Sequence, residues 1–204
     1  MNKTFIKLFF LMFLPVTTNC FCQDKDNTRL TDITKVTFFY PGISYEKSIA
    51  KFQSLYGQLF MNTSFAIGFS SEFGTTSYIH FDPAATLQYR YYYNSEKREA
   101  KGKRIQMNSL NYLASIVEVT FSKGSISSSY VTEKDRRAIN VAGIAWGFQR
   151  NYLKRFSLDI NLGAGFLFTR VTTINDSGEL TIKNEGQFTT IGQVNLGFWL
   201  NKKN

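Results

Sequence analysis

The stretch FSLDINLGAGFLF, residues 156–168, alternates in polarity almost residue by residue. Its even-numbered positions, from Phe156 through Leu162 to Phe168, are all apolar, whereas the odd-numbered ones are polar or glycine except for Leu167. A period of two is typical of a β-strand whose two faces meet different environments. The stretch is also long enough to cross a bilayer, for which about 9–11 tilted residues suffice.

The same alternation recurs along the chain, in residues 55–69, 81–93, 144–148 and 188–200. Between residues 105 and 121 the apolar parity changes near Tyr112 and Leu113, which indicates a β-bulge. No segment after the N-terminal region has a convincing helical period. The chain is therefore predicted to be all-β.

The connections set the number of strands. Seven strands are clear, and Pro41-Gly42 offers a tight turn between residues 32–40 and 43–49, which would give an eighth. Alternatively, one long first strand contains Pro41 at a bulge or an edge. We favour eight strands in an up-and-down antiparallel barrel. Residues 50–51, 95–104 and 151–154 would then lie at one end, and 71–77, 122–136 and 174–178 at the other.

Alternation alone does not say which face is the inside. The polar parity is rich in glycine and small residues, and most charged residues fall in the connections, as expected for a crowded interior. Aromatic residues gather near strand ends, which is typical of membrane interfaces. We therefore predict a transmembrane barrel rather than a soluble one, in which the large apolar residues would point inward. The aromatic groups are Tyr89, Tyr91, Tyr93, Trp146, Phe148, Tyr152, Phe156, Phe198 and Trp199.

The N-terminus is typical of an export signal, with Lys3 and Lys7 before the apolar run 8–14. Cys22 precedes the predicted cleavage site at Gln23. We expect a signal peptide over residues 1–22, a short N-terminal segment over 23–31 and an outer-membrane barrel over 32–204.

The lipoprotein alternative would acylate Cys20 or Cys22, but the usual leucine three residues earlier is missing from both positions. If cleavage occurs before Gln23, the mature chain has no cysteine and therefore no disulfide or thiolate metal site.

The formal net charge is +9, and the basic residues cluster in connections, notably at 97–104 and 134–137. Solvation or attraction to anionic lipid head groups explains such clusters. An exported protein without a basic nucleic-acid-binding module is not expected to bind nucleic acid. The predicted partner is outer-membrane lipid.

Several stretches resemble a family of small outer-membrane β-barrel proteins of Gram-negative bacteria, a barrel domain of unknown function. The stretches are PGISYE at 41–46, RYYYN at 90–94, the basic residues Lys97, Arg98, Lys101 and Lys103, NS at 108–109, NYL at 111–113 and the aromatic-rich final strand. The resemblance implies a fold and a location but no shared reaction.

Four charged residues fall on the predicted interior parity: Glu46, Arg90, Glu118 and Asp159. Unpaired charges are costly in a narrow interior, so we expect an ion-pair network that fills the barrel, with a conducting path as the alternative.

His80 and Asp82 lie two residues apart, on one face of a predicted strand near a rim. His80 is expected to be solvated at the rim or bonded to Asp82. The alternative is a lipid-modifying enzyme in which they orient a serine. One histidine cannot build a usual zinc site, and no phosphate-binding loop is present, so no catalytic residue, metal or cofactor is predicted. We expect a structural or surface-interaction role; a barrel that binds a small apolar ligand is the alternative.

Overall fold

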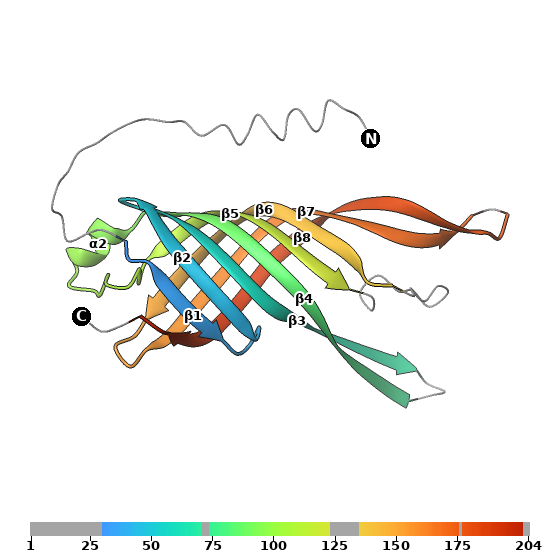
Figure 1. Ribbon diagram of the computed structural model, residues 1–204, viewed down its shortest axis with the longest axis horizontal. Coiled ribbons are helices and arrows are strands. Elements are labelled where there is room, and N and C mark those ends of the chain that lie inside the picture. The colour runs from blue at the N-terminus through green and yellow to red at the C-terminus, as the bar shows by residue number, and fades with distance from the viewer. Residues whose placement is uncertain (1–29, 71–73, 123–134, 176, 202–204) are drawn as a thin grey trace, which may run out of the picture.

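The computed structural model describes residues 30–70, 74–122, 135–175 and 177–201, with the side chains of 64–70 and 74–80 left out. Eight antiparallel strands form one closed sheet, and a single short helix is found among these residues (Figure 1). The all-β prediction is confirmed. The elements are β1 (Ile33–Thr37), β2 (Gly42–Ala50), β3 (Gln53–Ser70), β4 (Gly74–Tyr92), α2 (Ser95–Glu99), β5 (Asn111–Ser122), β6 (Arg137–Asn151), β7 (Phe156–Ile174) and β8 (Leu180–Trp199).

Each strand pairs with its neighbours in the sequence, and β1 pairs with β8 to close the ring. The closing register places Lys35 opposite Trp199 and Thr37 opposite Gly197. The strand count of eight is therefore confirmed over the single long first strand.

The first turn differs in detail from the prediction. It occupies residues 38–41, and Gly42 already belongs to β2. A Cβ atom at Gly42 would lie 2.1 Å from the carbonyl oxygen of Leu59 on β3. Glycine is therefore needed at Gly42 for the close approach of two strands rather than for the turn.

The predicted bulge near Tyr112 is wrong. β5 begins at Asn111 and keeps a continuous register with both β4 and β6. Residues 105–110 lie outside the strand, and the apolar side chains of Ile105 and Leu110 pack in a small cluster with Tyr92 and Tyr112. The change of parity therefore marks the start of a strand.

The distribution of apolar and charged side chains between the outside and the inside of the ring is the reverse of that in a water-soluble protein. Leu59, Ile144 and Leu162 are 64%, 71% and 66% exposed on the outside. Arg90, Glu46 and Asp159 are 0%, 0% and 2% exposed on the inside. Among the described side chains, most large apolar residues thus face outward, and most polar and small ones face inward together with a few apolar residues such as Ile33, Phe60 and Ile116.

The two ends of the ring differ. At the α2 end lie α2, the start of β1, the end of β8 and the short β2–β3 and β6–β7 turns (Figure 1). At the hairpin end, the β3–β4 and β7–β8 pairs run on beyond the ring (Figure 1). No helix among the described residues is both long and apolar enough to span a membrane.

Candidate functional site

The centre of the interior is occupied by Arg90, which the even parity of β4 turns inward between Gln88 and Tyr92. Its guanidinium donates to Asp159 Oδ2 at 2.8 Å and to Gln149 Oε1 at 3.1 Å, and its Nε donates to Gln88 at 2.9 Å. Hydrogen bonds of this kind offset the cost of removing a charge from water.

Two tyrosine rings enclose the Arg90 guanidinium. Its central carbon lies 3.8 Å from the ring centroid of Tyr56 and 4.3 Å from that of Tyr112. Such cation–π contacts are strongest where water is excluded. The Tyr112 hydroxyl also donates to Asp159 Oδ1 at 2.6 Å, so one aromatic side chain both shields the cation and binds its counter-ion.

A second pair of charges extends this arrangement toward β1 and β2. Lys35 Nζ donates to Gln149 Oε1 at 2.5 Å and lies 3.9 Å from Asp159 Oδ2. Glu46 accepts hydrogen bonds from Ser54, from Gln149 and from the Tyr92 hydroxyl. Two cations and two carboxylates therefore balance within one connected group.

We call Lys35, Glu46, Arg90, Gln149 and Asp159 the Arg90 cluster. Its members come from β1, β2, β4, β6 and β7, and every one is buried. Three of the four charged residues selected from the sequence thus lie together.

Lys35, Gln149 and the tyrosines around Arg90 were missed. Their positions on the inward-facing parity of the strands were the one signal that could have identified them, because lysine, glutamine and tyrosine are equally common on protein surfaces.

Glu118 lies apart from the Arg90 cluster. It faces inward on β5, and no hydrogen bond or ion pair joins it to another described residue. It lines a separate cavity with Gln88, Asn161 and Gln193. The expected pairing of all four interior charges therefore does not extend to Glu118.

The α2 end of the ring is covered by α2 and the residues after it. Asn108, at a positive φ of 54°, exchanges hydrogen bonds with both backbone groups of Thr31 at 2.8 and 2.9 Å. The Ser109 hydroxyl donates to the Asn151 carbonyl oxygen and accepts from the Asn151 N–H. These contacts hold the segment against the end of the ring.

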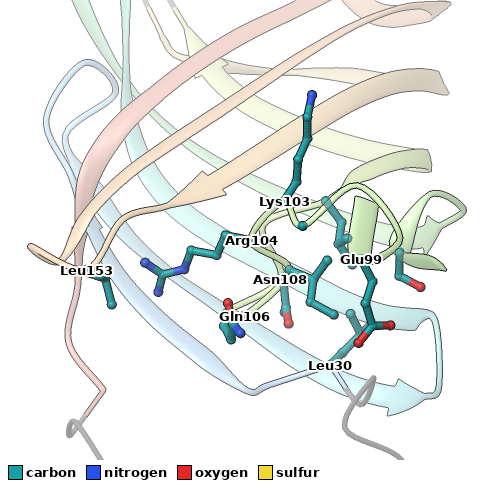
Figure 2. Close-up of a pocket in the computed structure, with 11 residues that line it drawn as sticks. Leu30, Glu99, Lys103, Arg104, Gln106, Asn108 and Leu153 are labelled. Atoms are coloured by element: carbon teal, nitrogen blue, oxygen red, sulfur yellow. The ribbon is translucent and has the colours of Figure 1, made fainter. Parts of the chain in front are cut away.

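Beside this segment lies an open cavity of about 810 Å³ (Figure 2). Leu30 lines it from the chain ahead of β1, Leu153 from the β6–β7 turn, and Glu99, Lys103 and Arg104 from α2 and the residues after it (Figure 2). Two of the basic residues predicted for this connection, Lys103 and Arg104, thus line a cavity at the α2 end.

The predicted rim pair is described only in part. His80 lies on β4 opposite Ser64, but its side chain is outside the described residues. Asp82 is buried and accepts a hydrogen bond from Ser122 Oγ at 2.6 Å. In a catalytic triad the histidine stands between serine and acid, whereas here the serine bonds the acid directly.

No metal site is found in the described part of the chain, where no three His, Cys, Asp or Glu side chains gather. The predicted cleavage site at Cys22 and Gln23 lies outside the described residues. Comparison of the chain with protein family models, with curated proteins and with solved structures finds no match in any of the three.

Proposed function

We propose that this chain is a transmembrane β-barrel of a Gram-negative outer membrane, with a structural or surface-interaction role and no reaction of its own. The observation that carries the proposal is the inverted polarity of the ring: buried charged and amide side chains lie inside it beside aromatic and a few aliphatic ones, and large apolar side chains cover the outside. In water, an apolar surface around a whole ring would drive aggregation. Facing acyl chains, it is the stable arrangement.

Aromatic side chains near the α2 end support this location. Tyr91, Tyr93, Trp146 and Tyr152 are 43%, 47%, 43% and 48% exposed, and the Trp146 indole donates to the Tyr93 hydroxyl. Rings with a polar tip suit the boundary between acyl chains and head groups. Trp199, predicted from the sequence to join them, instead faces inward and donates to the Tyr152 carbonyl oxygen.

The surface role rests on the shape of the hairpin end. β7 and β8 pair continuously from Phe156↔Phe198 to Ile174↔Leu180, well past the level at which the ring closes (Figure 1). With both ends of the described chain at the α2 end, the topology of known outer-membrane barrels would place the hairpins outside the cell. The projecting hairpins are therefore the proposed contact surface.

The alternatives receive less support. The Arg90 cluster occupies the interior with bonded charges, which is unfavourable for an apolar ligand. For the same reason we expect no open pore. The lipid-modifying alternative rests on His80, whose side chain lies outside the described residues, and its predicted partner Asp82 is bonded to Ser122.

The proposal is tested by gel migration of the detergent-extracted mature chain with and without boiling. A closed transmembrane barrel resists the detergent, so the unboiled protein is expected to run faster than the boiled one. The expected source is the outer-membrane fraction. Recovery of folded protein from the soluble fraction, with no shift on boiling, would contradict the proposal.

A bilayer measurement tests the closed interior. The reconstituted protein is expected to give no steady single-channel current, because the Arg90 cluster fills the ring. Reproducible steady channels from the unaltered protein would show that the interior conducts.

A further inference from the structure

A second interior site lies on the hairpin side of the Arg90 cluster. It is a cavity of about 210 Å³ whose walls come from the turn after β1 and from β3 to β8. Its volume corresponds to several water-sized groups. We call it the Glu118 cavity; the lining residues used below are Phe60, Glu118, Val141, Asn161 and Ile191.

Two acceptors that line the Glu118 cavity have no donor within the described part of the chain. The Glu118 carboxylate is bonded to no other described residue. Asn161 is 2% exposed, and its Oδ1 accepts no hydrogen bond within the described part of the chain. Buried acceptors are normally satisfied, and an unpaired carboxylate is costly. Both side chains thus lack a donor, and the half-buried Glu118 carboxylate favours one that carries positive charge.

Two interior cations among the described side chains have partners elsewhere. Lys35 is bonded to Gln149, and Arg90 is bonded to Asp159, Gln149 and Gln88. A bound species is the remaining source of positive charge for Glu118 within the described part of the chain.

The rest of the lining indicates which kind of cation fits. Phe60 meets Tyr40 edge to face at a centroid distance of 5.6 Å, and Val141 and Ile191 add aliphatic carbon. Aromatic faces favour organic cations. A divalent metal ion usually takes more than one carboxylate ligand, whereas Glu118 is the single carboxylate in the lining of this cavity, where amide side chains such as Asn161 alternate with apolar ones such as Phe60.

We propose that the Glu118 cavity binds a small organic ammonium ion. Its N–H groups donate to the Glu118 carboxylate and to Asn161 Oδ1, and its carbon chain packs against Phe60 and Ile191. The site lies inside the ring, so the proposal does not depend on whether the outside of the ring meets lipid.

The test is saturable binding of n-propylammonium to the folded, detergent-solubilised full mature chain, followed by ligand-observed NMR. Glu118→Gln keeps the size of the side chain but removes its charge, and is expected to weaken binding by about tenfold or more. Glu185→Gln removes an exposed carboxylate from β8 and is expected to leave binding unchanged. The neutral analogue n-propanol is expected not to bind.

Val141→Phe keeps every polar group of the cavity but fills its space, and is expected to abolish binding. It serves as the test if Glu118→Gln does not fold. Equal binding of n-propanol, unaltered binding by the folded Glu118→Gln or Val141→Phe variant, or displacement by an equal concentration of sodium would each overturn the proposal. The absence of any n-propylammonium binding by the unaltered chain would overturn it as well.

Discussion

Arg90 on β4 and Asp159 on β7 join two strands that are not neighbours in the ring, through a hydrogen-bonded ion pair of 2.8 Å. Neither side chain is measurably open to solvent, and the tyrosines around them replace water. The ring is therefore held together by its backbone ladder and by contacts across its interior.

Removing one partner of this pair should be far more damaging than removing both. Arg90→Met leaves the buried Asp159 carboxylate with Lys35 as its remaining cation. The change is expected to lower the free energy of unfolding by about 3–5 kcal/mol. Arg90→Met combined with Asp159→Leu should cost clearly less than the sum of the single changes. Denaturant titrations of protein refolded in lipid vesicles measure these values.

Lys183→Met, which removes an exposed cation from β8, is the control and should stay within about 0.5 kcal/mol. Strict additivity of the two single changes would show that Arg90 and Asp159 act independently.

Close approach of strands gives a second prediction. A Cβ atom at Gly163 would lie 2.1 Å from the Ile144 carbonyl oxygen and 2.5 Å from the Ala145 Cα, both on β6. Backbone atoms held in a strand ladder cannot move aside, so Gly163→Ala is expected to lower the free energy of unfolding by about 1–3 kcal/mol. At Gly57 nothing lies within 4 Å of the added atom, so Gly57→Ala should be nearly neutral. Equal stability of the two variants, by the same titrations, would refute the packing of β6 against β7.

Acid should weaken the contact between the start of the ring and β2. Asp32 accepts hydrogen bonds from Lys47 Nζ, the Ser48 N–H and the Tyr45 hydroxyl at 2.9, 2.8 and 3.2 Å. The Lys47 ammonium and the Ser48 N–H hold the pKa of Asp32 below its usual 3.8. A carboxyl with a depressed pKa in the folded state stabilises above 3.8, and this stability is lost as the pH falls through the lower folded value.

The Asp32→Asn variant should therefore be less stable than the unaltered chain near neutral pH and should converge with it as the pH falls below the lowered pKa of Asp32. Glu179→Gln, at the exposed tip of the β7–β8 hairpin, is the control for general loss of charge. A stability difference for Asp32→Asn that is constant from neutral to acid pH would show that the ionised carboxylate is not responsible.

The alternation of single residues made most of the ring predictable. Leu162 and Asp159 lie on opposite parities of one stretch, and the structure places them on opposite faces. Strand order follows because short connections between alternating stretches leave only antiparallel neighbours.

Contacts between distant strands could not be predicted in the same way. The residues next to Arg90 in the sequence do not show that its partner is Asp159 rather than Glu118. That pairing depends on the height of each strand, which is its position along the axis of the ring. The register that sets these heights comes from glycine contacts such as Gly163 against β6, which a single sequence does not reveal. The sequence did not predict that α2 and the residues after it cover the α2 end, because α2 has only five residues, too few to display a helical period.

Orientation can be tested with a matched pair of turn positions. Gly102 and Gly178 both have positive φ, 61° and 82°, and both have open space around an added side chain. Gly178→Cys should react with an impermeant maleimide on intact cells, whereas Gly102→Cys should react only after the outer membrane is permeabilised. Reaction of both variants, or of Gly102→Cys alone, on intact cells would contradict the proposed orientation. Ser127, in the β5–β6 connection, is expected to behave like Gly178 but lies outside the described residues.

The central claim is that the apolar outside of the ring meets acyl chains, and fluorescence quenching by lipids brominated along those chains tests it directly. The chain has two tryptophans, of which Trp146 is 43% exposed on the outside and Trp199 is 4% exposed inside. One variant carries Leu162→Trp with both native tryptophans replaced by phenylalanine, and the other retains Trp199 alone. In reconstituted bilayers, strong quenching at position 162 and weak quenching of Trp199 are predicted. Absence of quenching at 162, or equal quenching of both, would contradict the account.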